Sequence, residues 1–265
     1  MNLYAATGRI FLGICLTGIG VLHFFFPGIR PIILPNSTAI TPSLYWIVYA
    51  TGIVLTGSGI FIIINKKTAT ISLIMAAVFF ILFFVGHLPA FLSVQGLEKL
   101  KYWTNLNKVL ALSGGFLILS FIYVREDGNI KPIAFFKVIS VIGRCFFALM
   151  LLLFGIGHLT STASLSTLVP PYIPFGRFWT FAGGIILVGS AISFFINFKV
   201  RISAFILAGT LFTWLITLHL YYALLFPAWQ EGENFIGSLT CMAFCGIALL
   251  IAQNSSAYKS IPQHT

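Results

Sequence analysis

Eight runs of about 20 mostly apolar residues divide this chain, and they constrain its fold more than any other feature. Charged residues make up only 8% of the sequence, whereas soluble domains carry about a quarter, so most of the surface must face lipid. A membrane β-barrel needs strands that alternate in polarity, and these runs are continuously apolar. The sequence therefore predicts an all-α membrane protein with eight transmembrane helices, at residues 9–26, 44–64, 69–92, 107–124, 135–158, 177–197, 201–225 and 235–252.

The basic residues indicate how these helices are oriented. Ten of the fifteen lysines and arginines fall on one side: Arg9, Lys66, Lys67, Arg125, Lys131, Lys137, Arg144, Lys199, Arg201 and Lys259. The other side has five, together with Glu98, Glu231 and Glu233. The positive-inside rule predicts a multi-pass protein with both termini cytoplasmic, and we expect it to lie in a bacterial inner (plasma) membrane. Because the net charge of +10 is distributed in this way, it does not indicate a nucleic-acid partner.

Tryptophan and proline mark the opposite, outer side. Four of the five tryptophans lie at the outer ends of the apolar runs, where amphipathic rings prefer the interface, and Trp214 lies inside a run. The proline-rich segments 29–43 and 165–176 join runs on this side. Proline fixes φ and removes a backbone donor, so we expect both segments to form ordered caps across the mouth of the bundle.

The two halves of the chain repeat one another. In the first run of each half the spacing is 135: Gly8, Arg9 and His23 match Gly143, Arg144 and His158. From the second run onward it is 132: Ala50, Gly52, Gly57, Ser58, Asn65 and His87 match Ala182, Gly184, Gly189, Ser190, Asn197 and His219. The fourth runs match poorly. A spacing that changes in a loop indicates duplication, and we predict two tandem four-helix bundles, residues 1–130 and 131–265, related by a parallel pseudo-two-fold axis.

Four histidines near the outer ends of these runs are the candidate ligand-binding residues: His23, His87, His158 and His219. Ionisable groups within membrane spans are costly and mark functional sites. One interpretation pairs His23 with His87 and His158 with His219 in small polar pockets that contact a quinone carbonyl or another small ligand. In the other, each imidazole bonds a carbonyl of a neighbouring helix or cap.

Haem held by two histidines is a further, less favoured alternative to quinone as the cofactor. No carboxylate or cysteine lies near the histidines in sequence to complete a metal shell, so no metal site is assigned. Cys241 and Cys245 share a helix face as packing residues or, alternatively, as a redox pair. We expect the recurrent glycines to allow close helix packing, and Arg9 and Arg144 to anchor the inner boundary.

Several of these features resemble the DoxX family of membrane proteins. The resemblance rests on a Gly-Arg start, a first span rich in small residues that ends in histidine, and the segment VPPYIPFGRFWTFAGGIILVGS at residues 169–190. It implies two fused four-helix units. Many relatives carry a glutamate in the second span, where this chain has Leu55 and Leu187. Association of some relatives with thiosulfate:quinone oxidoreductase, and of others with redox-stress complexes, implies a quinone-linked role and a redox partner protein.

No nucleophile–base pair, phosphate-binding loop or dinucleotide motif is present in the sequence, and no catalytic residue is assigned. We therefore expect an accessory membrane subunit rather than an independent enzyme, one that handles quinone or relays reducing equivalents near the outer face. The alternative is a non-catalytic membrane scaffold or small-solute transporter. Histidines that face one another around a cavity would favour ligand handling, and histidines bonded to the caps would favour a structural role.

Overall fold

The computed structural model of the chain describes residues 2–26, 28–35, 41–96, 99–126 and 133–257, and all regular secondary structure in these ranges is helical. Eight helices are long and apolar enough to cross a membrane, which confirms the predicted all-α class and number of spans. Six are single helices: α1 (Leu3–Phe25), α2 (Tyr45–Ile63), α5 (Lys99–Glu126), α6 (Ile133–Thr160), α8 (Gly176–Phe195) and α11 (Glu233–Ala257).

The other two spans each contain a π-turn near the end away from the chain termini, which is the end that the sequence predicts to be outer. One runs through α3 (Thr68–Leu82), the π-turn η3 (Phe83–His87) and α4 (Leu88–Ser93). The second runs through α9 (Val200–Trp214), the π-turn η6 (Leu215–His219) and α10 (Leu220–Leu225). Each π-turn ends at a candidate histidine, and single π-turns of this kind occur often at functional sites.

The predicted helix boundaries differ most in α5, which begins at Lys99 rather than at residue 107, while α1 begins at Leu3 rather than at 9 and α11 ends at Ala257 rather than at 252. The first three turns of α5 carry Lys101, Asn105 and Asn107, so hydropathy alone placed the start too late. Asn105 and Asn107 are nevertheless buried, because α5 lies in the interior of the protein and not at its lipid-facing surface.

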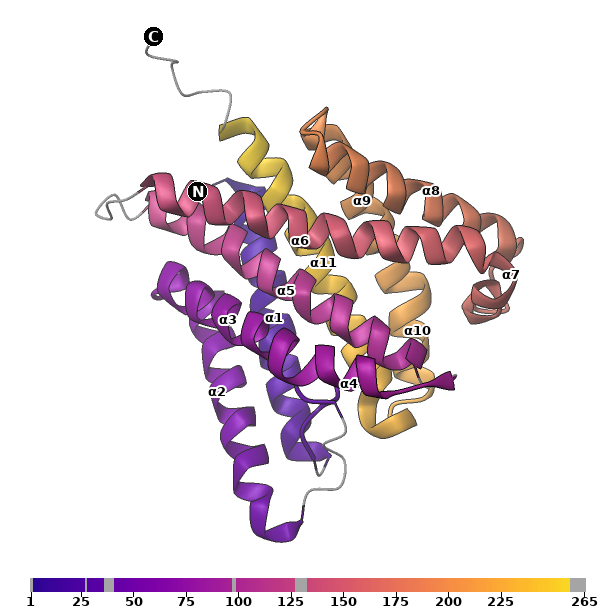
Figure 1. Cartoon of the computed structure of the whole chain (residues 1–265), viewed down its shortest axis with the longest axis horizontal. Coiled ribbons are helices and arrows are strands. Elements are labelled where there is room, and N and C mark those ends of the chain that lie inside the picture. The colour runs from indigo at the N-terminus through magenta and orange to yellow at the C-terminus, as the bar shows by residue number, and fades with distance from the viewer. Residues whose placement is uncertain (1, 27, 36–40, 97–98, 127–132, 258–265) are drawn as a thin grey trace.

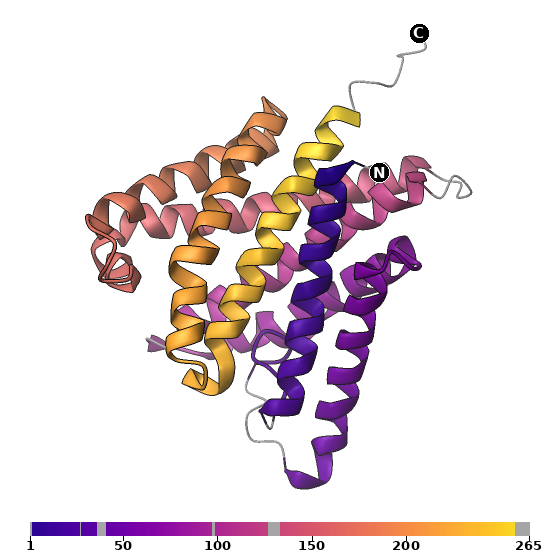
Figure 2. The same ribbon diagram turned by 180° about the vertical axis from the view of Figure 1, so that it is seen from behind.

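Helices α5 and α11 form the centre of the molecule, and the others pack around them (Figures 1 and 2). Helix α1 packs on α2 and on α11, and α6 packs correspondingly on α8 and on α5. The first helix of each half therefore packs against the fourth helix of the other half. The two predicted units, residues 1–130 and 131–265, interlock, and their boundary stays a prediction.

Glycine pairs form these two interlocking contacts. A Cβ atom on Gly8 would lie 2.7 Å from the carbonyl oxygen of Gly246 in α11. At the second contact, a Cβ on Gly143 would collide with the carbonyl oxygen of Gly114 in α5, and a Cβ on Gly114 would collide with the carbonyl oxygen of Gly143. Lipid provides no hydrophobic drive for helices to associate, so close backbone approach at small residues provides much of the packing energy.

The same local features recur in the two halves at the predicted spacings. Besides the π-turns, left-handed residues occur at Asn65 and Lys67 and again 132 residues later. The Ser113 hydroxyl donates to the carbonyl of Ala76, and the Cys245 thiol donates to that of Ala208, also 132 residues later. The fourth helices thus correspond in their contacts although their sequences match poorly. These recurrences support the predicted duplication, and the two-fold axis itself stays a prediction.

The two outer connections differ from each other. In the first, residues 29–33 are buried against the bundle, with Ile33 only 7% exposed, as expected for an ordered cap. In the second, residues 162–168 form the short helix α7 (Thr162–Leu165) and a 3-10 turn (Ser166–Leu168), and Leu168 is 57% exposed. The expected cap is thus found over the described residues 29–35. The second segment, 165–176, begins with this local helical structure and is more exposed, although Tyr172 still bonds to the bundle. Residues 36–40 lie outside the described ranges.

Both ends of the described chain lie on one side of the bundle, since the start of α1 packs against the end of α11 (Figure 2). Three charged residues used to orient the chain lie outside the described ranges: Glu98, Lys131 and Lys259. On the outer side Trp46, Trp179 and Trp229 are more than half exposed, as side chains of an interfacial belt should be.

The close crossing of α5 and α6 predicts a position-dependent effect of added methyl groups. Gly143→Ala places a Cβ against backbone and should lower the free energy of unfolding by about 1–3 kcal/mol. Gly157→Ala, in the same helix, meets nothing within 4 Å and should be neutral or stabilise by up to about 1 kcal/mol. Unfolding in mixed micelles, followed by circular dichroism, measures both. Equal effects would contradict the crossing.

Candidate functional site

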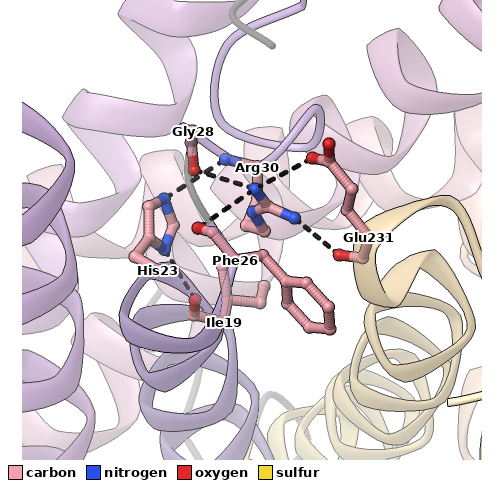
Figure 3. Close-up of polar contacts among 6 residues, drawn as sticks. All are labelled: Ile19, His23, Phe26, Gly28, Arg30 and Glu231. Carbon is pink, nitrogen blue, oxygen red and sulfur yellow. Dashed lines mark hydrogen bonds and ion pairs between the residues drawn. The ribbon is translucent and has the colours of Figure 1, made fainter. Parts of the chain in front are cut away.

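Arg30 is fully buried at the outer end of the first half, where it joins that half to the 3-10 turn η7 (Trp229–Gly232) that precedes α11 (Figure 3). Its guanidinium donates to the carbonyl of Glu231 at 2.5 Å and to that of Gly28 at 2.9 Å, and it lies 3.4 Å from the Glu231 carboxylate. It also lies over the Phe26 ring. Burial lowers the pKa of Arg30 from its ordinary value, and the nearby Glu231 charge opposes that shift.

His23 is buried beside Arg30, and both of its ring nitrogens are used (Figure 3). Nδ1 lies 2.8 Å from the carbonyl oxygen of Ile19. A carbonyl only accepts, so Nδ1 carries the proton and the neutral ring has its lone pair on Nε2. That nitrogen accepts the backbone N–H of Arg30 at 3.3 Å. His23 is therefore bonded to the first cap, which favours a structural role by the criterion above.

His87 is also covered by the first cap. The side chain is buried, and neither ring nitrogen has a hydrogen-bond partner within normal geometry. A Cβ on the adjacent Gly86 would lie 3.2 Å from Leu34 of the cap. His87 thus lies under the same segment as His23, and the described residues include no hydrogen bond or ring contact between the two.

His158 occupies the position equivalent to His23 but has different surroundings. Its Nδ1 lies 2.8 Å from the carbonyl oxygen of Phe154, so its tautomer is the same as that of His23. Its ring stacks on Trp214, with centroids 5.6 Å apart and an interplanar angle of 6°. Among the described residues nothing donates to Nε2. The second cap instead bonds to η6, where the Tyr172 hydroxyl donates to the Thr217 carbonyl.

His219 ends the π-turn η6 and faces α11. A Cβ on Gly237 would lie 3.3 Å from its Nδ1, so only glycine leaves room for the ring at this distance. The charge of Lys108 in α5 acts on His219, and Lys108 also interacts electrostatically with Glu233 at the start of α11. No hydrogen bond or ring contact between described residues joins His219 to His158.

The structure therefore gives each of the four histidines its own neighbours. The pairings of His23 with His87 and of His158 with His219 are not among the described contacts, and ligand binding by the four residues stays a prediction. A cavity of about 200 Å³ lies beside His23, lined also by Tyr45 and Tyr49. Within the described ranges, no three His, Cys, Asp or Glu side chains cluster in a way that could hold a metal ion.

The remaining residues singled out from the sequence have structural contacts. Arg9 donates to the carbonyls of Ile62 and Ile63 at the end of α2, and Arg144 donates to Asn197 just beyond the end of α8. These contacts fit the expected anchoring role. The thiols of Cys241 and Cys245 are free and donate to carbonyls of α9 at 3.3 and 3.4 Å. Leu55 and Leu187, at the two positions where the resemblance implies a glutamate in many DoxX proteins, are buried.

Three charged residues near the outer end did not figure in the predicted site: Arg30, Lys108 and Glu233. From the sequence they were used only to orient the helices, because each was assigned to a connection between helices or to the end of a helix. For Lys108 a signal was present, because a lysine within an apolar span is itself a functional-site hypothesis. The start of α5 was placed at residue 107, which made Lys108 look terminal.

Comparison of the chain with protein-family models, curated proteins and solved structures gives no match. The DoxX-like assignment therefore stays a prediction, and the functional argument rests on the geometry.

The contacts of Arg30 predict that its hydrogen bonds to backbone carbonyls stabilise the fold more than its ion pair with Glu231 does. Arg30→Met leaves several buried carbonyl groups without a donor and should lower the free energy of unfolding by about 3 kcal/mol or more. Glu231→Gln keeps the backbone carbonyl bond, and the Glu231 side chain is 46% exposed, so its loss should be below about 1 kcal/mol. Thermal unfolding in detergent measures both variants. A larger effect of Glu231→Gln would show that the ion pair dominates.

Proposed function

We propose that this polytopic membrane protein is an accessory subunit that binds a lipid-soluble quinol at the outer end of its second half, beside His158 and Trp214. One observation carries the proposal. His158 has the position and tautomer of His23, but its Nε2 has no donor among the described residues, whereas Nε2 of His23 accepts the Arg30 N–H. The second half thus has an acceptor available at the place where the first half is capped.

The tautomer of His158 determines which hydrogen-bonding group the ligand must present. Because Nδ1–H of His158 is bonded to Phe154, the free nitrogen of the neutral ring can only accept. A quinone carbonyl also only accepts, so the oxidised ring offers His158 no hydrogen bond. A quinol hydroxyl donates one. The expectation of a quinone carbonyl against the imidazole is therefore replaced by the reduced form of the same ligand class.

The surroundings of His158 suit a hydrophobic ring ligand. The imidazole is held flat by its parallel stacking on Trp214, and a Cβ on Gly184 would lie 3.0 Å from the His158 Cβ, so α6 and α8 fix the base of the side chain. In the second cap, which could have covered the site, half of the residues 165–176 are exposed. A ring ligand entering from the lipid would meet a rigid aromatic pair and a single oriented acceptor.

The proposal also includes the family, the membrane, the orientation and the partner protein expected from the sequence. We infer two DoxX-like units in a bacterial inner membrane with cytoplasmic termini, and a redox partner protein that oxidises the bound quinol. The recurrent contacts at spacings of 132 and 135 support the duplication. The excess of basic residues on the side of the termini supports the orientation.

Binding of a short-chain benzoquinol to the protein in nanodiscs, measured calorimetrically against empty nanodiscs, tests the function. The quinol should bind about tenfold or more tightly than the matching quinone, because only the quinol forms the hydrogen bond to His158. His158→Leu should remove this preference. His23→Leu is the matched control and should leave the affinity unchanged, since His23 is already bonded to the cap.

Trp214→Phe should weaken binding of both redox forms, and Trp179→Phe should not, since Trp179 is exposed. Equal affinity for quinol and quinone, or unchanged binding by the His158→Leu variant, would contradict the proposal. The scaffold alternative would then account for the histidines.

A further inference from the structure

The cavity beside His23 lies between the end of α1 and the start of α2, at the outer end of the first half. Its volume is about 200 Å³, and it is lined by His23, Phe24, Phe25, Phe26, Tyr45, Val48 and Tyr49. An apolar cavity of about 150 Å³ accepts benzene, so this space can hold a compact group of similar size. None of these residues carries a charged side chain, and His23 already uses both ring nitrogens.

Aromatic side chains make up most of the wall, and the packing of α1 on α2 positions them. The rings of Phe24 and Tyr49 are parallel, with centroids 6.1 Å apart and an interplanar angle of 8°. A Cβ on Gly52 would lie 3.1 Å from the Phe24 ring, so the glycine lets that ring lie against α2. Together with Phe25 and Tyr45, these two rings give the cavity four aromatic side chains from two helices.

The nearest buried cation, Arg30, is directed away from this cavity. Arg30 lies between His23 and Glu231 (Figure 3), and its guanidinium donates to the Glu231 carbonyl. It lies over the Phe26 ring, and that ring packs against Gly232 rather than against α2. The Glu231 carboxylate, 3.4 Å away, compensates the charge of Arg30. The aromatic cavity is therefore not occupied by a cation of the protein.

The end of α1 adds negative polarity at the same place. This helix of 23 residues ends at Phe25, and the last four carbonyls of a helix have no donor within it. No described backbone N–H outside the helix donates to the carbonyls of Phe24 or Phe25. Since the aligned peptide dipoles place a partial negative charge at such an end, the cavity favours a cation over an anion.

The depth and the walls of the cavity restrict which cation fits. Trp46, which follows Tyr45, is 66% exposed, and tryptophans at span ends mark the membrane interface, so the occupant comes from the headgroup level or from the aqueous side. A primary ammonium is compact and strongly hydrated, and it has three donors to satisfy. A quaternary ammonium has no N–H and an apolar surface, and groups of aromatic rings recognise it through cation–π contacts. Water held poorly between aromatic rings is readily displaced by such a group.

We propose that the cavity formed by Phe24, Phe25, Tyr45 and Tyr49 binds a quaternary ammonium group, carried by a lipid headgroup or by a small solute. The site is separate from the quinol site at His158 and does not depend on it. At spacings of 135 and 132, the equivalent residues of the second half are Leu159, Thr160, Arg177 and Phe181. One ring there replaces four, and a basic side chain would repel the cation, so the site belongs to the first half.

Calorimetric titration of choline into the full-length protein in phosphatidylglycerol nanodiscs, against empty nanodiscs, tests the proposal. Dimethylbutanol, the uncharged carbon isostere of choline, has its shape without its charge, and ethanolamine has a charge without the methyl groups. Choline should bind about tenfold or more tightly than either, because only choline combines a positive charge with an apolar surface. Equal affinity for the isostere or for ethanolamine would overturn the proposal.

Variants of the two stacked rings locate the site. Phe24→Leu and Tyr49→Leu should each weaken choline binding about fivefold or more, and Tyr49→Phe should retain most of it, since the ring is kept. Phe181→Leu is the matched control, because Phe181 is the equivalent of Tyr49 and is similarly exposed, at 49% against 47%. It should leave binding unchanged, and so should His158→Leu, which separates this site from the quinol site.

Circular dichroism establishes that each variant is folded, and Tyr49→Leu, at an exposed position, decides the matter if Phe24→Leu does not fold. Unchanged choline binding by Tyr49→Leu, or no binding at millimolar choline, would contradict the proposal. Addition of phosphatidylcholine to the nanodiscs identifies the source of the group. Loss of choline binding on this addition supports a lipid headgroup as the occupant, and undiminished binding supports a soluble quaternary ammonium.

Discussion

Close backbone contact at two glycine pairs is the constraint on which the rest of this structure depends. Gly8 against Gly246, and Gly143 against Gly114, bring the first helix of each half onto the fourth helix of the other. Because lipid solvates an apolar helix as well as another helix does, such contacts decide which helices associate. Their consequence is that α5 and α11 are enclosed, and polar residues on these two helices can face protein rather than lipid.

On this common scaffold the two halves differ in their outer connections, and the difference has consequences for chemistry. In the first half Arg30 holds the cap in place through Glu231, and the cap in turn uses the free nitrogen of His23. In the second half a short helix replaces the buried cap, and the equivalent nitrogen of His158 stays available. Under the proposed duplication, one copy therefore uses its histidine structurally, and the other offers the acceptor that the quinol proposal requires.

The sequence predicted the helices well because hydropathy acts on the whole run of about 20 residues, and all eight spans were confirmed. The four histidines were correctly placed near the outer helix ends, but their partners were not predicted. The path of the cap decides what His23 contacts, and proline content alone does not distinguish a buried segment from an exposed one. Lys108 was not singled out because hydropathy placed the start of α5 at residue 107, whereas the helix begins at Lys99 and lies at the centre of the bundle.

A buried charged residue, Arg30, links the first cap to the second half of the chain at the outer end of the bundle. Arg30 is fully buried and donates hydrogen bonds to carbonyls of both halves, so its contribution to stability is made at the contact between the cap and the second half. Lys108 and Glu233 lie nearby in the same interface between halves, yet neither is bonded in this way. Hydrogen bonding is incomplete in both sets, since Nε of Arg30 and Oε1 of Glu233 are both buried without a partner. What distinguishes Arg30 is that its other guanidinium nitrogens donate to carbonyls of both halves, so this buried charge holds the cap to the rest of the bundle.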